Sequence, residues 1–487
     1  MRHSTHRQAP RPVRPAAAAV SKMLSRAWSL PPQRNFVAIE RNVQVPMSDG
    51  AVLLADHYLP VTSQPAATVL VRCPYGRGAP FSLLQAQLVA ERGFHVLLQS
   101  VRGTFGSGGQ ERVNPLSGMV RQATADRRLR PALDRAPVSA GARDLLGTGA
   151  PWFETWLEHP ELTDPFWAPL QCGAALERIS VPTLLIGGWQ DLFLEQTIEQ
   201  FGALAARGVP TRMLLGPWTH LDTATRAGPA FIESLAWLER HAGQVPGEPA
   251  AGHSVRFWVG GAREWRETAT WPPAGQPPQR WYLGPDGTLS SKEPGSKEPG
   301  SDEAAAGSPV SFRYDPADPT PSVGGAILAL NAGVRDNRVV EQRPDVLLFT
   351  SEPLAEPVEI VGDVAAELHV TRDNPNADLF VRLCDVDPPG DAKSRSRNVC
   401  DGIVRLTSAD PLTGTVRVSL IGAAHRFGRG HRLRLQVAGG AHPRFARNPG
   451  NGQVDAPAKD FVVTHYRIRS PSALVISQAA GKEAAHA

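Results

Sequence analysis

Three short apolar runs in this chain each end at a polar side chain that can take part in chemistry. They are VLVRCPY, which ends at Tyr75, TLLIGGWQD, which ends at Asp191, and RMLLGPWTH, which ends at His220. Short runs rich in Val and Leu and bounded by Gly or Pro are typical of strands buried in a parallel sheet. Because functional groups gather just beyond the carboxyl ends of such strands, we expect Tyr75, Asp191 and His220 to lie along one edge of a sheet.

The surrounding pattern predicts two series of strands and helices. Residues 36–62 contain two strands around a Ser-Asp-Gly turn, and a strand, a helix over 81–93 and another strand follow. The second series has the Asp191 strand, a helix over 194–208, the His220 strand and a helix over 231–243. Residues 109–180, between the two series, contain helix-like and Trp/Pro-rich segments without a strand pattern.

From about Ser254 onward the pattern changes to an alternation of polar and apolar residues. At least eight such runs, among them HRLRLQV at 431–437, are separated by Gly, Pro and Asp turns. This pattern predicts an antiparallel β-sandwich. The low-complexity segment 291–307, with its SKEPG repeat, is typical of a solvated loop.

Composition excludes several classes of protein. The chain has 487 residues, 41% hydrophobic and 20% charged, with a formal net charge of +4, so we expect two or more domains of an ordinary globular kind and no nucleic-acid partner. Its four cysteines show no CxxC spacing and its histidines no ligand spacing, so we expect free thiols, no metal and no cofactor. No apolar stretch is long enough to span a membrane.

The first 35 residues carry seven Lys or Arg side chains and no acidic one. They lack the apolar core of a signal peptide, and Pro10, Pro12 and Pro15 interrupt any long helix. We therefore expect residues 1–35 to be a basic flexible segment, and we expect the protein to be cytoplasmic. A membrane-surface or targeting arm is the alternative.

The order of Asp191 and His220 indicates an acyl-transfer site. One helix and one strand separate the two residues, which is the chain order of the last two members of a Ser-Asp-His triad on an α/β-hydrolase sheet. There the carboxylate holds the imidazole in one tautomer, and the imidazole takes the proton from a serine. The alternative is that Asp191 caps the following helix and His220 packs beside Trp218.

Tyr75 follows a strand at the place where an α/β-hydrolase supplies one oxyanion donor. A phenol there could donate a hydrogen bond to the developing oxyanion. A half-buried tyrosine in a Pro-Tyr-Gly turn explains the residue equally well.

The nucleophile is missing. It should lie on a Gly-x-Ser-x-Gly elbow before the Asp191 strand, and the chain has no such element. Ser107 is a candidate within Phe-Gly-Ser-Gly-Gly, but Phe105 replaces the first glycine. Ser117 and Ser139 fit less well, and neither Cys73 nor Cys172 sits on an elbow.

These residues make the chain similar to the cocaine-esterase-like (CocE/NonD) family, which is related to X-Pro dipeptidyl peptidases. The resemblance rests on VPMSDGAVLLADHYLP, VRCPYGRG, SVRGTFGSGG, PTLLIGGWQDLF and GPWTH, and on DPADPTPSVGG, DLFVRLCDVD, RSRNVCDG and HPRFARN further on. It covers most of residues 40–470. It implies an α/β plus all-β fold and cleavage of esters or amides through a Ser-Asp-His triad. Asp191 would be the triad acid, His220 the base and Tyr75 the oxyanion tyrosine.

The chain departs from this family at one place. After GTFGSGGQERVNP the family continues through a helix, a strand, the serine elbow, its helix and a further strand, whereas here residues 117–120 already resemble cap sequence. We infer a deletion of roughly 100 residues, the length that such a unit and half a cap require. The implied domains are an incomplete α/β-hydrolase domain (36–116 and 181–247), a remnant helical cap (117–180) and a jelly-roll β-sandwich (253–480).

Two functional hypotheses follow. In the first, the chain is a serine-type acyl hydrolase by descent, acting on a small ester, amide or peptide, that has lost its nucleophile and is impaired or inactive. In the second, it is a non-catalytic protein that binds a partner through the jelly roll. A damaged reading frame is an alternative explanation for the gap. We also expect the Tyr75 strand, deprived of its neighbour, to pair with the Asp191 strand, and the opened sheet edge to offer a surface for a homo-oligomer.

Overall fold

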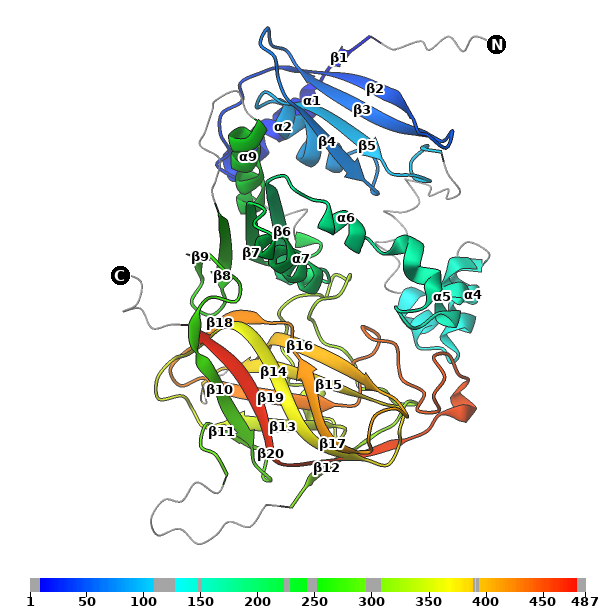
Figure 1. Ribbon diagram of the computed structural model, residues 1–487, viewed down its shortest axis with the longest axis vertical. Helices are drawn as coiled ribbons and strands as arrows, with labels where there is room; N and C mark the ends of the chain where they lie inside the picture. The colour runs from blue at the N-terminus through cyan, green and yellow to red at the C-terminus, as the bar shows by residue number, and fades with distance from the viewer. Residues whose placement is uncertain are drawn as a thin grey trace. The chain divides into compact units, whose positions relative to one another are not determined.

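The computed structural model describes residues 9–108, 128–147, 151–222, 228–242, 252–294, 308–388, 390 and 394–479. The chain divides into two compact units (Figure 1). The N-terminal unit consists of Met1–Asp126 and Ala224–Ala250, and the C-terminal unit of Arg127–Thr223 and Ala251–Ala487.

A five-stranded sheet organises the N-terminal unit, in the order β1-β2-β3-β5-β4. Strands β2 and β3 form the predicted hairpin, β3 and β5 pair antiparallel, and β5 and β4 pair in parallel. The strand bounds are β1 Arg11–Pro12, β2 Val37–Pro46, β3 Val52–Pro60, β4 Thr68–Cys73 and β5 His95–Ser100.

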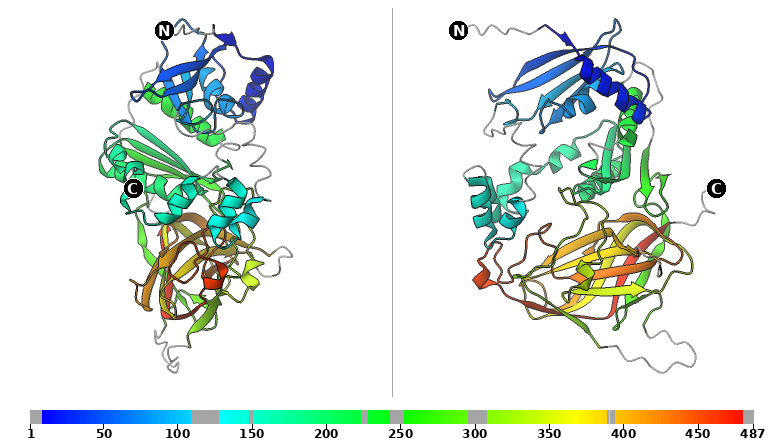
Figure 2. Two further views of the ribbon diagram at one scale, coloured as in Figure 1. Left: turned by 90° about the vertical axis from the view of Figure 1, so that its right-hand side faces the viewer. Right: turned by 180° about the vertical axis from the view of Figure 1, so that it is seen from behind.

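Helices pack on one face of this sheet. That face presents alternate residues of β4 and β5, such as Val69, Val71, Val96 and Leu98, which share an apolar core with α2 and with Leu235 of α9. Two views show the helices gathered on this side (Figure 2). The helical bounds are α1 Pro15–Ala27, η1 Ser82–Gln87, α2 Leu88–Ala90 and α9 Gly228–Ala242, so the predicted helix over 81–93 is present but begins as a π-helix.

The expected flexible N-terminal segment is wrong for the described residues 9–35. Pro15 stands in the first turn of α1, where its missing N–H costs no hydrogen bond, so it starts a helix instead of breaking one. The Ser21 hydroxyl donates to the buried Glu91 carboxylate at 2.6 Å. The Arg92 guanidinium donates to the Ser25 hydroxyl, and Trp28 packs against the ring of Phe231. These contacts fix α1 to the unit.

The C-terminal unit contains the two strands that end beside the candidate residues Asp191 and His220. Its four-stranded sheet has the order β6-β7-β8-β9, in which β6, β7 and β8 are parallel and β9 is antiparallel. The bounds are β6 Thr183–Gln190, β7 Thr211–Thr219, β8 His253–Val259 and β9 Glu264–Thr268, and α7 spans Leu194–Ala206, close to the predicted 194–208. Met213 and Leu215 of β7 pack with Val255 and Phe257 of β8 in one core.

The region before β6 is helical, as the sequence predicted. Within residues 128–147 and 151–180, the described part of it, the structure has no strand. The helices there are α4 Val138–Leu146, α5 Pro151–Glu158, η3 Pro165–Leu170 and α6 Gly173–Glu177.

The remainder of the C-terminal unit is an all-β sandwich, which confirms the α/β plus all-β class. Its core is an apolar cluster that includes Leu368, Val381, Leu435 and Ile476. The strands are β10 Gly275–Leu283, β11 Thr288–Ser290, β12 Val310–Tyr314, β13 Val346–Ser351, β14 Val358–Arg372, β15 Ala377–Val386, β16 Ser396–Leu406, β17 Thr413–Ser419, β18 Ala423–Phe427, β19 Arg432–Ala438 and β20 Thr464–Ala479. Of the low-complexity segment, residues 295–307 lie outside the described residues.

The domain boundaries differ from the prediction. We expected residues 36–116 and 181–247 to form one α/β domain, but β6, α7 and β7 belong with the sandwich, and α9 belongs with the N-terminal sheet. The reason is that β7 pairs with β8, which leads directly into the sandwich.

The predicted pairing of the Tyr75 strand with the Asp191 strand is wrong. Strand β4 is an edge strand that pairs with β5 alone, and β6 is an edge strand that pairs with β7 alone, in a different sheet. Each therefore has one unpaired side among the described strands.

The β7–β8 core gives a stability prediction. Met213 is fully buried in this core, whereas Met23 on α1 is 61% exposed. We expect Met213→Ala to lower the free energy of unfolding by about 2–5 kcal/mol, because it leaves a cavity, and Met23→Ala to change it by less than about 0.5 kcal/mol. Urea denaturation followed by circular dichroism measures both changes. Equal midpoints for the two variants would contradict the burial of Met213 in the β7–β8 core.

Candidate active site

Asp191 is fixed by the turn that joins β6 to α7. Its backbone N–H donates to the Gly188 carbonyl at 3.0 Å, and its Oδ1 accepts from the Phe193 N–H at 3.0 Å. The side chain is buried. A Cβ at Gly188 would stand 2.2 Å from the Trp218 carbonyl oxygen, so only glycine lets β7 approach the end of β6 this closely.

His220 follows the last residue of β7 and meets this carboxylate. Its Nδ1 lies 3.3 Å from Oδ1 and 3.4 Å from Oδ2 of Asp191. The imidazole is partly exposed, and its ring meets the ring of Phe193 edge-on at 5.3 Å. The structure thus brings together the two residues that the sequence paired. Carboxylate contact with Nδ1 is what holds an imidazole with Nε2 directed away from the acid.

The turn after β7 is braced by its own side chains. The Thr219 N–H and hydroxyl both donate to Asp222 Oδ2, at 3.2 and 2.9 Å. This arrangement closes the chain tightly after the strand, so that the neighbouring His220 has a defined direction.

Gln190 ties the end of β6 to the sandwich. Its Nε2 donates to the Val399 carbonyl at 2.9 Å, and its Oε1 accepts from Asn398 Nδ2 at 3.2 Å. Asn398 Oδ1 in turn accepts from the Arg335 N–H at 2.7 Å. Gln190 and Asn398 are both buried. Sequence reasoning missed this link because the partners are more than 200 residues apart and share no local pattern.

Tyr75 lies in the N-terminal unit, just beyond β4. It is 52% exposed, its ring stacks on Phe81 with centroids 5.2 Å apart, and its N–H donates to Cys73 Sγ. Its place beside Asp191 and His220 remains a prediction.

None of the described nucleophile candidates has a nucleophile's surroundings. The Ser107 hydroxyl is buried and is used twice by the backbone: it accepts from the Leu54 N–H and donates to the Ser100 carbonyl, both at 2.9 Å. Ser139 is also buried, and burial raises the pKa of the Cys73 thiol. Cys172 is exposed and unbonded to any other cysteine. Ser117 lies outside the described residues.

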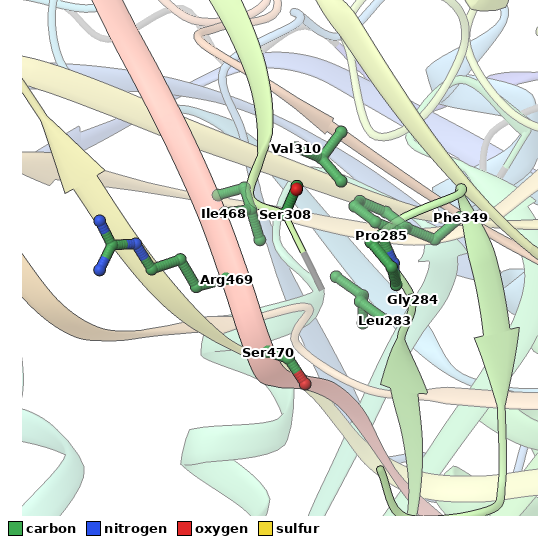
Figure 3. Close-up of a pocket in the computed structure, with 9 residues that line it drawn as sticks. All are labelled: Leu283, Gly284, Pro285, Ser308, Val310, Phe349, Ile468, Arg469 and Ser470. Atoms are coloured by element: carbon green, nitrogen blue, oxygen red, sulfur yellow. The ribbon is translucent and has the colours of Figure 1, made fainter. Parts of the chain in front are cut away.

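One further pocket, in the sandwich, is too small to be a second site. The pocket in Figure 3 lies between strands of the sandwich and is lined by apolar side chains such as Leu283, Val310 and Phe349, with Arg469 pointing away from it. Its volume of about 10 Å³ holds about one water molecule. Across the described ranges, no cluster of His, Cys, Asp or Glu could hold a metal ion. In the same ranges no helix is long and apolar enough to cross a membrane.

Parallel strands that end in a carboxylate–imidazole pair, followed by an all-β sandwich, define a class of acyl-transfer hydrolase fold. The family model of X-Pro dipeptidyl-peptidase (S15 family) matches residues 49–127 and 115–222, and that of the X-Pro dipeptidyl-peptidase C-terminal non-catalytic domain matches residues 250–479. The chain belongs to this family, whose two models together match residues 49–222 and 250–479.

Individual proteins of this kind are also similar to the chain in sequence or in fold. The chain is 30% identical over 338 residues to the cocaine esterase of Rhodococcus sp. (strain MB1 Bresler), an alignment that covers 64% of this chain and 58% of that one. The chain thus spans little more than half the length of this relative. Its fold is similar to that of an α-amino acid ester hydrolase (TM-score 0.73, 21% identity, 91% and 96% of the two chains) and of a CocE/NonD family hydrolase from Staphylococcus aureus (TM-score 0.62, 14% identity, 91% and 94%).

The Gln190 link can be tested directly. Gln190→Ala removes the buried donor to the Val399 carbonyl and one of the two acceptors of the Asn398 Nδ2 group, which keeps its bond to the Gly333 carbonyl. We therefore expect a loss of about 1–3 kcal/mol in unfolding free energy. We also expect the NMR signals of the His220 ring to shift, because the end of β6 carries Asp191. The matched control is Gln171→Ala, which removes one exposed hydrogen bond to Leu162. If Gln190→Ala changed the unfolding free energy and the His220 signals no more than this control does, the hydrogen bonds of Gln190 to the sandwich would not fix the end of β6.

Proposed function

We propose that this chain is a serine-type acyl hydrolase of the S15 and cocaine-esterase-like kind that keeps the acid and base of its triad and lacks the nucleophile. The observation that carries the proposal is a contrast. Asp191 and His220 form a pair, but the sequence contains no nucleophile elbow and the strands β4 and β6 are edge strands. The pair is in place at 3.3 Å, while the chain contains no Gly-x-Ser-x-Gly sequence.

The sheet edges support this proposal. In an α/β-hydrolase the nucleophile strand and one further strand stand between the strand that precedes Tyr75 and the strand that precedes Asp191. Here β4 and β6 are the edges of separate sheets. We therefore infer that the missing segment carried the two central strands that would pair with β4 and with β6.

The family match supports the same place for the loss. The S15 model matches this chain in two segments, and these meet at residues 115–127. This is where the sequence passes from the loop after β5 into cap-like sequence. A match divided at this point is expected when the intervening part of the family pattern has no counterpart in the chain.

The chemical consequence follows from the roles of the triad. Without a serine there is no acyl-enzyme intermediate, and the elbow also supplies a backbone donor of the oxyanion hole. Loss of the nucleophile alone costs such enzymes roughly 10⁶-fold in rate. His220 then has no hydroxyl to deprotonate, and Tyr75 would be the one remaining oxyanion donor.

The substrate class is that of the relatives. The cocaine esterase is named for an ester, the α-amino acid ester hydrolase for amino-acid esters, and the S15 family for X-Pro peptide bonds. We propose that the ancestor of this chain cleaved a small ester, amide or peptide. No cofactor enters this chemistry.

Labelling with a fluorophosphonate tests the proposal. We expect the purified, folded chain to acquire no phosphonyl adduct by intact mass and to hydrolyse a short activated ester no faster than its His220→Ala variant. The reason is that phosphonylation needs a serine activated by the imidazole.

The cocaine esterase serves as the positive control under the same conditions. One adduct on one serine of this chain, lost in His220→Ala, would overturn the proposal, since it would reveal a working nucleophile. Circular dichroism of the labelled sample confirms that a negative result comes from folded protein.

A further inference from the structure

Strand β4 of the N-terminal unit is an edge strand, but it is regular and apolar in the way that interior strands usually are. Its six residues pair in parallel with β5 in an unbroken register from Thr68 to Cys73, and no other described strand pairs with it. Leu70, at its centre, is 49% exposed. The strand therefore presents a straight row of unpaired backbone groups beside an exposed apolar side chain.

Two other sheet edges, at β2 and at β9, carry protective features that β4 lacks. In β2, beside the two-residue β1, the register shifts between Glu40 and Val43, and such a bulge bends an edge away from further pairing. In β9 the sequence EWRET places charged residues along the edge. Strand β4 has no bulge, no proline and a single charge, Arg72. An edge of this kind is a template for pairing with another strand.

The sequence of β4 is self-complementary in an antiparallel arrangement. With a two-fold axis through Leu70, this leucine faces Leu70 of the second copy, Val69 faces Val71, and Thr68 faces Arg72. No like charges meet, and the valines of both copies lie on the face that packs on the helices. The apolar face of one sheet would continue without interruption into that of the other.

We propose that β4 is a homodimerisation strand, which pairs antiparallel with β4 of a second copy of this chain around a two-fold axis at Leu70. The second copy is the partner that the strand itself specifies, because a two-fold interface needs a surface complementary to itself. Within one chain, β5 alone among the described strands pairs with β4. This inference concerns the N-terminal unit and holds whether or not the chain is catalytically active.

Disulfide cross-linking tests the register. In a background with the exposed Cys172 changed to serine, Leu70→Cys should form a covalent dimer in mild oxidant, because directly opposed residues have Cα atoms about 4.5–5.5 Å apart, within reach of a disulfide. Thr68→Cys is the matched control on the same face. In the proposed register its two copies lie about 13 Å apart along the strands, so it should stay monomeric on denaturing gels.

Sedimentation or light scattering over a concentration series tests the interface without cysteine. We expect a dimer for the unaltered chain, and an increase in its dissociation constant of at least about tenfold for Leu70→Lys, since two ammonium groups would then face each other across the pair. Leu162→Lys, at a leucine that is 76% exposed in the C-terminal unit, should leave the constant unchanged. A monomer at all concentrations, a dimer that Leu70→Lys does not weaken, or cross-linking at position 68 and not at 70 would each overturn the proposal.

Discussion

The parallel pairing of β7 with β8 is the contact on which the candidate site depends. Strands β6 and β7 carry Asp191 and His220, and β6 has no described neighbour on its other side. An isolated pair of strands is marginal in water, because it leaves its apolar faces exposed. Pairing with β8 and β9 makes these strands part of a four-stranded sheet with its own core, and β8 leads directly into the sandwich. The acid and base thus keep their geometry within the C-terminal unit.

The sandwich also reaches the site through side chains. The amide of Gln190 is satisfied by Asn398 and by the Val399 carbonyl. Since buried amides without partners are costly, this contact fixes the end of β6 one residue before the candidate acid. A domain whose family model is described as non-catalytic therefore positions a residue of the proposed catalytic pair.

The sheet of the N-terminal unit, in contrast, has an open edge at β4. The unit has the hairpin, the helices on one face and an apolar core, and β4 forms one end of its sheet. Arg77 still connects the loop after β4 to the rest of the unit, because it donates to Asp56, to the Ser100 hydroxyl and to the Phe105 carbonyl. These contacts fix the loop beside Tyr75 to the rest of the unit, and β4 stays an edge strand with the exposed Leu70.

Local pattern was enough for those features that arise within a few residues. The hairpin around Ser48–Gly50, the helix α7 and the strands that end at Asp191 and His220 follow from apolar periodicity and turn residues, and the meeting of Asp191 with His220 follows from the common direction of parallel strands. The helix α1 was missed, because its stability comes from Glu91, Arg92 and Phe231, which are distant in sequence. The division into units, the unpaired edge at β4 and the Gln190 link were decided by the tertiary structure alone, since strand order and buried hydrogen bonds depend on which distant segments meet.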